Sequence, residues 1–163
     1  MYHKVRGEGR PLVFLHGFCE THSLWNHIVP HFFTQYKVYT PDLPGFGNSP
    51  LSTTGSLSID KIATQLHDWM LSQQIKNPTL IGHSLGGYII MSYLEQYPDQ
   101  CAAAVLLHSN AMEDTDLRKA NRLKVLEFIK KQGVAKFIES FVPSLFNPLN
   151  RQKYQELITH MIA

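Results

Sequence analysis

The sequence predicts an α/β fold: an open, mostly parallel sheet with helices on both faces. Two features of the chain lead to this prediction. Four short apolar runs have the length of strands, and segments with helical periodicity lie between them. The apolar runs are continuous rather than alternating, which is typical of parallel strands that are covered on both faces. The strand–helix–strand order then favours right-handed crossovers within one sheet.

The strands are expected where turn-forming residues bound the apolar runs. Gly17 closes the first run, and Pro41 stops the second before a turn-rich stretch at residues 42–50. We expect the four strands at Pro11–His16, Tyr36–Thr40, Thr79–Gly82 and Ala102–His108.

Helical spacing marks the segments between and after the strands. A helix is expected from Ser58, because apolar residues recur on one face as far as Met70. A buried central helix is expected over residues 85–97, ended by Pro98. Three helix-like segments follow His108 without an intervening strand. We expect them at about 116–131, at 134–141 ending before Pro143, and from Asn147 onward, with Ala163 still inside the helical period.

The composition is that of an ordinary globular domain and excludes several classes of function. Lys plus Arg total 15 and Asp plus Glu total 13 in 163 residues, so the net charge of +2 gives no reason to expect a nucleic-acid or anionic-membrane partner. No apolar stretch has the length of a membrane span, and no signal-peptide pattern follows Met1. Cys19 and Cys101 show no metal-type spacing, so reduced thiols and a cytoplasmic location are expected.

A serine between glycines is the strongest chemical signal in the chain. Residues Gly82–Gly86 read G-H-S-L-G and lie between an expected strand and an expected helix, the context that gives the G-x-S-x-G motif its meaning. Such a turn strains the serine, and its glycines leave room for neighbouring backbone. The N–H groups at the start of the helix face a developing oxyanion. A glycine-rich turn with an idle Ser84 is the alternative interpretation.

Three stretches together resemble the α/β-hydrolase family: His16–Phe18 after the first expected strand, Asp42–Ser49 after the second, and Gly82–Gly87 after the third. The resemblance covers about residues 2–108, and the helices beyond resemble the start of the family's cap. It therefore implies a hydrolase core over residues 1–110 and an incomplete helical cap over residues 111–163.

The resemblance also implies roles for individual residues. Ser84 matches the nucleophile, and the backbone N–H groups of Phe18 and Leu85 match the two oxyanion donors. His16 matches a residue that braces the oxyanion loop, and Asp42 is interpreted as a carboxylate that fixes a loop rather than as a catalytic acid. No cofactor and no metal are expected, since the histidines show no ligand spacing.

The sequence shows no clear base for the serine. The family places the acid and then the histidine after the nucleophile, beyond the cap, so the resemblance implies a chain truncated before both, with weak activity on its own. His108 is a candidate local base, but a strand-end histidine hydrogen-bonded to backbone is the favoured interpretation. Glu113 and Asp114 are candidate acids, with a helix N-cap as the alternative for Asp114. His83 is expected to point away from the site, and Cys19 to be an apolar filler.

The sequence therefore predicts a serine hydrolase that acts on a small-molecule ester or related acyl substrate through an acyl-enzyme. The alternative is a non-catalytic relative that binds a ligand or partner through the same pocket. A last expectation concerns the strand at Ala102–His108. In the complete fold, a strand from the missing C-terminal part would pair with its outer edge. In the isolated chain that edge would be unpaired, so we expect the chain to self-associate through this edge.

Overall fold

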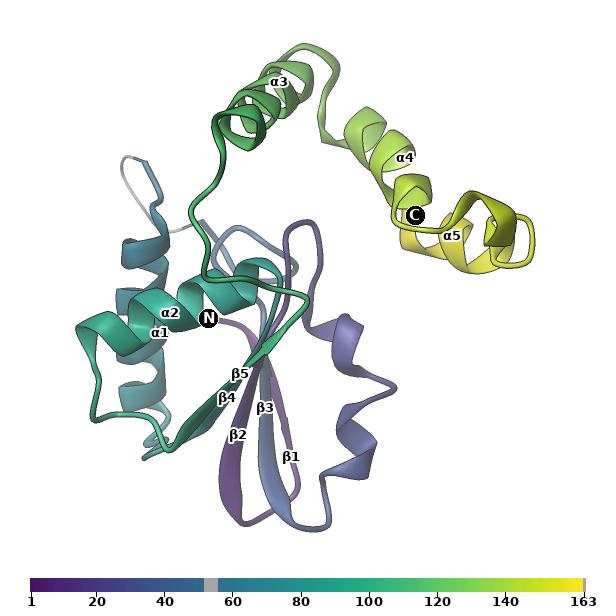
Figure 1. The fold of residues 1–163 in the computed structure, drawn as a ribbon. Helices are drawn as coiled ribbons and strands as arrows, with labels where there is room; N and C mark the ends of the chain where they lie inside the picture. The colour runs from purple at the N-terminus through teal and green to yellow at the C-terminus, as the bar shows by residue number, and fades with distance from the viewer. Residues whose placement is uncertain (52–55, 163) are drawn as a thin grey trace. The chain divides into compact units, whose positions relative to one another are not determined.

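The computed structural model describes residues 1–51 and 56–162, and the chain divides into two compact units, Met1–Ala111 and Met112–Ala163. The first unit contains a sheet with helices, and the described part of the second contains helices (Figure 1). Each unit buries apolar side chains of its own.

Five strands of the first unit form one sheet in the order β1–β3–β2–β4–β5 (Figure 1). β1 pairs antiparallel with β3, and all other neighbours are parallel. This arrangement confirms the mostly parallel α/β sheet expected from the sequence. The strands are β1 (His3–Arg6), β2 (Arg10–Leu15), β3 (Tyr36–Pro41), β4 (Thr79–His83) and β5 (Ala103–Leu107).

The sequence pattern does not reveal β1. Its four residues are mostly exposed and include Lys4 and Arg6, so they form no apolar run. Pairing with β3, in which Lys4 lies opposite Thr40 and Arg6 opposite Val38, holds this strand in the sheet. The other four strands agree with the prediction to within one residue at each end.

The two α-helices of the first unit follow the expected spacing. α1 begins after Ser58, whose side chain accepts the N–H of Lys61, and it buries the apolar face that the sequence predicted. α2 is buried or half-buried except at its last two residues, as expected for a central helix. The helices of this unit are α1 (Ile59–Ser72), α2 (Leu85–Gln96) and the short 3-10 helices η1 (His22–Trp25) and η2 (Val29–His31).

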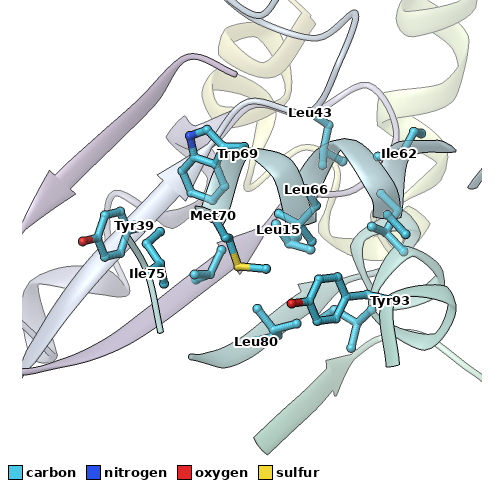
Figure 2. Close-up of a cluster of buried hydrophobic side chains, with 14 residues drawn as sticks. Leu15, Tyr39, Leu43, Ile62, Leu66, Trp69, Met70, Ile75, Leu80 and Tyr93 are labelled. Atoms are coloured by element: carbon cyan, nitrogen blue, oxygen red, sulfur yellow. The ribbon is translucent and has the colours of Figure 1, made fainter. Parts of the chain in front are cut away.

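Alternate side chains of β2 point to opposite faces of the sheet and enter two different apolar clusters. Val13 and Leu15 pack with residues of α1 and α2 in the larger cluster, part of which is seen in Figure 2. Leu12 and Phe14 pack with residues of η1 and η2 in the smaller one. Helices therefore lie on both faces, and within the described residues of the first unit the helices over one of these faces are the 3-10 helices η1 and η2.

The face beneath η1 and η2 is incompletely covered. A groove of about 500 Å³ lies along β2, β4 and β5, and Phe14, Ile81 and Leu107 are among the side chains that line it. β5 forms one edge of the sheet, and among the described residues its one strand partner is β4. Its Val105 and Leu106 side chains are 41% and 39% exposed. An apolar strand therefore ends the sheet, beside the Ser84 strand as expected.

The second unit consists of helices that bury few side chains. Phe137, Val142 and Ile158 are its buried apolar residues, and α3 contributes no buried residue. Across residues 1–51 and 56–162, no helix is both long and apolar enough to cross a membrane. The helices of the second unit are α3 (Asp116–Gln132), α4 (Val134–Ser144), η3 (Pro148–Asn150) and α5 (Gln155–Ile162).

Two boundaries in the second unit differ from the prediction. Pro143 lies inside α4 instead of following it. The last turn is closed by i→i−3 bonds such as Leu145 N–H to Val142 C=O, and these do not need the N–H that proline lacks. The third segment begins as η3, capped by the side chain of Asn147, and becomes α-helical only at α5. Ala163, expected within that helix, lies outside the described residues.

Candidate active site

Ser84 occupies the turn between β4 and α2 in a rare backbone conformation. Its φ is 47° and its ψ is −108°, a region that non-glycine residues seldom adopt. The ladder between β4 and β5 continues into the turn, because the Ser84 N–H donates to Leu107 C=O at 3.0 Å. The Ser84 carbonyl accepts the Gly87 N–H at 3.0 Å and the Ser109 hydroxyl at 2.9 Å. These hydrogen bonds hold the strained turn.

Glycine is required on both sides of Ser84. A Cβ on Gly82 would lie 2.5 Å from the carbonyl carbon of Gly86, and a Cβ on Gly86 would lie 2.4 Å from Leu15 O. This confirms that the two glycines make room for neighbouring backbone. A Cβ on Gly87 would lie 2.4 Å from Ser109 Oγ, so this glycine accommodates the segment after β5.

His16 orients the loop that follows β2. It is fully buried, and its Nε2 accepts the backbone N–H of Leu43 at 2.9 Å. The proton of the neutral ring therefore lies on Nδ1, which donates to Gly17 C=O at 2.8 Å. In a trans peptide the N–H of Phe18 points opposite to that carbonyl. Burial lowers the pKa of His16, which favours the neutral ring, so His16 braces the peptide of the candidate donor as expected.

Asp42 fixes the loop after β3. Its buried carboxylate accepts the backbone N–H of His22 at 2.7 Å, the His22 ring Nδ1 at 2.8 Å and the N–H of Asn48 at 2.9 Å. Burial acts to raise the pKa of Asp42, but the hydrogen bonds from Asn48 and His22 outweigh it and the pKa lies below its ordinary value. A Cβ on Gly47 would lie 2.3 Å from this carboxylate. The contacts agree with a loop-fixing carboxylate.

Glu20 connects the loop after β2 to the Ser84 turn, and the sequence did not point to it. One carboxylate oxygen, Oε2, accepts the Gly17 N–H at 2.6 Å and binds Nδ1 of His83 at 2.8 Å. His83 directly precedes Ser84, and its ring is directed to Glu20. No local pattern marks this contact, because the two side chains are 63 positions apart in the sequence.

Among the residues that the structure describes, no candidate base is hydrogen-bonded to the Ser84 hydroxyl. Its side chain makes no capping hydrogen bond at α2, and the described imidazoles and carboxylates form none with its hydroxyl. His108 has a φ of 46°, and its ring centroid lies 6.1 Å from that of His83. The hydrogen bond to backbone that we expected for the His108 ring is not found within the described part of the chain.

The two acidic candidates after β5 are engaged by basic residues of α3. Glu113 binds Lys119 at 2.6 Å, and Asp114 binds Arg122. The hydrogen bond from Arg122 is the main cause that lowers the pKa of Asp114. The expected N-cap role of Asp114 is wrong, because the side chain of Thr115 accepts the first-turn N–H of α3 instead. Thr115 has the extended backbone that a cap requires.

Thiol and metal chemistry receive no support from the geometry. Burial, and then the charge of Glu20, raise the pKa of Cys19, so its thiol stays protonated at neutral pH. Both cysteines are free. Within the described ranges, no group of three or more His, Cys, Asp or Glu side chains could hold a metal ion.

Comparison with known proteins identifies the family. The sequence profile described as alpha/beta hydrolase fold matches residues 10–155. The chain belongs to the α/β-hydrolase fold family. The resemblance seen in the three loop stretches of the sequence is thereby confirmed.

The curated relatives of this α/β-hydrolase chain include an esterase and a lipase. It is 34% identical over 104 residues to a pimeloyl-[acyl-carrier protein] methyl ester esterase of Aeromonas hydrophila, a match that covers 64% of this chain and 39% of that protein. It is 35% identical over 102 residues to a (lyso)-N-acylphosphatidylethanolamine lipase of Bos taurus, covering 60% and 29% of the two chains. The chain thus spans well under half the length of these relatives.

Solved structures share the fold over almost the whole chain. A thermophilic esterase from Thermogutta terrifontis superposes with a TM-score of 0.87 at 25% identity, covering 99% of this chain and 59% of that one. A bromoperoxidase from Bacillus anthracis superposes with a TM-score of 0.86 at 21% identity, covering 99% and 62%. The similarity to the bromoperoxidase shows the fold alone, and a fold by itself does not determine the chemistry.

Proposed function

We propose that this chain is the nucleophile-bearing part of a serine hydrolase that acts on an ester or related acyl substrate. The observation that carries the proposal is the backbone of Ser84, which is held in a rare conformation at the N-terminus of α2. A strained strand-to-helix turn exposes the serine hydroxyl at the end of the sheet. The relatives named as an esterase and a lipase support the acyl class of substrate.

In the proposed reaction, Oγ of Ser84 attacks the acyl carbonyl and gives its proton to a general base. The base passes the proton to the leaving alcohol, and water then cleaves the acyl-enzyme to release the acid and restore the hydroxyl. The backbone N–H groups of Phe18 and Leu85 stabilise the oxyanion in both steps, and each such donor is worth roughly 3–4 kcal/mol. His16 assists by orienting the peptide of Phe18.

This chain covers 39% and 59% of two of its relatives, and the base and its orienting carboxylate are proposed to come from sequence C-terminal to residue 163 in the complete protein. The family order of nucleophile, acid and histidine supports this assignment. The free thiols of Cys19 and Cys101 support a reducing, cytoplasmic location, and no metal or other cofactor has a role in the proposed chemistry.

A serine-directed phosphonate probe tests the nucleophile. In the complete enzyme we expect labelling at Ser84 that Ser84→Ala abolishes, and Ser72→Ala on the surface of α1 should leave labelling intact. The 163-residue chain alone should turn over p-nitrophenyl acetate weakly, with a residual enhancement of roughly 10³–10⁴ over water or less. Labelling that survives Ser84→Ala contradicts the assignment.

The second candidate function is ligand binding without chemistry. It is favoured by the lack, among the described residues, of a base bonded to the Ser84 hydroxyl. On this hypothesis the complete protein binds an acyl ligand equally well after Ser84→Ala and does not react with the phosphonate. Calorimetric titration with a short-chain carboxylic acid, next to the labelling experiment, separates the two functions.

A further inference from the structure

The two candidate oxyanion donors stand on different segments, the loop after β2 and the first residue of α2. Phe18 follows β2 and Leu85 follows β4, and the last paired residues of these neighbouring strands are Leu15 and Gly82. Beyond that pair, no hydrogen bonds between β2 and β4 set the distance between the segments that follow these two strands. Their separation therefore depends on contacts that join the two segments to one another.

Glu20 supplies such a contact through a single oxygen atom. Its Oε2 accepts the Gly17 N–H, one peptide before the Phe18 N–H, at 2.6 Å. The same atom binds Nδ1 of His83, one residue before Ser84, at 2.8 Å. The Glu20 and His83 side chains are 20% and 26% exposed, so most of each side chain is shielded from solvent. The loop after β2 and the end of β4 are thus tied to one carboxylate at points adjacent to the Phe18 N–H and to Ser84.

The backbone of the loop is fitted to this bridge. A Cβ on Gly17 would lie 2.6 Å from Glu20 Oε2 and 2.9 Å from His83 Nδ1, so a side chain at this position would displace the two partners from the bridge. The other side of Gly17 is held by His16, whose Nδ1 donates to the Gly17 carbonyl. The peptide that carries the Phe18 N–H is therefore restrained from two directions.

We propose that Glu20 is a positioning residue that sets the separation of the Phe18 and Leu85 N–H groups, a role that rests on the proposed function of Ser84. Its carboxylate touches neither substrate nor reacting atoms; it acts through the Gly17 peptide and through His83. The donors must reach the position of the oxyanion and not of the ground-state carbonyl. Loss of the bridge therefore weakens binding of the transition state more than binding of the substrate.

Steady-state kinetics of the complete enzyme test the proposal. Glu20→Ala is expected to lower kcat roughly 10- to 100-fold, because a shift of about 1 Å in such a group has effects of that size. KM should stay within about threefold of the wild-type value, because an interaction made only in the transition state is removed. Glu20→Gln keeps an oxygen acceptor at the same place and should lose less. Glu95→Ala, at an exposed position of α2, is the matched control and should leave kcat unchanged.

Two further measurements separate positioning from a general structural role. A boronic acid, which forms a tetrahedral adduct on the serine, should lose affinity in Glu20→Ala by the same factor as kcat/KM, and the affinity for a product carboxylic acid should not change. Adding His83→Ala to Glu20→Ala should cause little further loss of kcat, since both changes break one bridge.

The outcomes distinguish the positioning role of Glu20 from the proposed function of Ser84 as the nucleophile. Activity that persists in Ser84→Ala overturns the serine mechanism, whatever Glu20 does. Ser84-dependent activity with unchanged kcat and boronic-acid affinity in Glu20→Ala overturns the positioning role alone. A loss of the phosphonate-titratable fraction or of thermal stability that accounts for the whole fall in kcat also overturns it, because the defect is then in folding.

Discussion

Ser84 has a strained backbone that hydrogen bonds from neighbouring residues hold in place. A non-glycine residue in such a sparsely populated region costs about 1–3 kcal/mol. The hydrogen bonds that the turn makes with Leu107, Gly87 and Ser109 contribute on the order of 1 kcal/mol each and offset this strain. Two of the three partners belong to β5 or to the segment that follows it. The conformation of the candidate nucleophile therefore depends on the neighbouring strand as well as on its own glycines.

Asp42 makes the stability of the first unit dependent on pH. Its pKa is lower in the folded chain than in the unfolded chain, so the unfolded chain binds the proton more readily as the pH falls. The stabilisation is complete above the ordinary carboxyl pKa of about 4. It is lost as the pH falls from there through the lower pKa of the folded state.

We expect Asp42→Asn to lower the free energy of unfolding by roughly 1–3 kcal/mol at pH 7, because three donors lose a charged acceptor. The variant should also lose less stability than the wild type between about pH 4 and pH 2. Urea unfolding at stepped pH values measures both effects. Asp99→Asn, at an exposed position, is the control. A variant with the pH dependence of the wild type contradicts the assignment.

At the scale of elements, α1 packs against the rest of the first unit through one apolar face. Leu66 is fully buried in the cluster of Figure 2, whereas Leu71 on the same helix is 59% exposed. Leu66→Ala should cost roughly 2–5 kcal/mol of unfolding free energy, because it leaves a cavity between α1 and the sheet. Leu71→Ala makes the same chemical change on the exposed face and should stay within about 0.5 kcal/mol of the wild type. Urea denaturation compares the two, and equal losses would contradict the assigned face.

At the scale of the whole molecule, the two edges of the sheet differ in how they are protected. β1 carries Lys4 and Arg6, and charged side chains discourage pairing with another chain. β5 reads Ala-Ala-Val-Leu-Leu and exposes Val105 and Leu106 beside the apolar groove. We propose that the isolated chain self-associates through the β5 edge.

A lysine on β5 tests this proposal. Val105→Lys should shift the isolated chain toward monomer in light scattering over a range of concentrations, because a charge then lies on the apolar edge. Val5→Lys makes the same substitution on β1, where Val5 is 44% exposed, and should change the association little. A wild-type chain that stays monomeric at high concentration contradicts the proposal. A separately expressed C-terminal fragment that suppresses scattering would show what normally covers β5.

The sequence by itself determined the α/β class, four of the five strands and the boundaries of α1 to α4 to within a few residues, but it placed the start of the last helix at Asn147, whereas α5 begins at Gln155. These features depend on local patterns: continuous apolar runs, helical spacing and turn residues. It also indicated Ser84, because a serine between Gly82 and Gly86 at a strand-to-helix junction is a local signal. β1 has no apolar run that would mark it in the sequence, because it is held in the sheet by pairing with β3 and most of its side chains are exposed.

Only the tertiary structure decided how the candidate site is held together. Glu20 meets His83 across 63 positions, Ser109 meets Ser84 across 25, and Asp42 meets His22 across 20. Such contacts arise where β2, β3, β4 and β5 end side by side, and polar residues in the loops carry no periodicity that marks them in advance. The residue types were visible in the chain, but their pairing follows from the parallel sheet that brings the strand ends together.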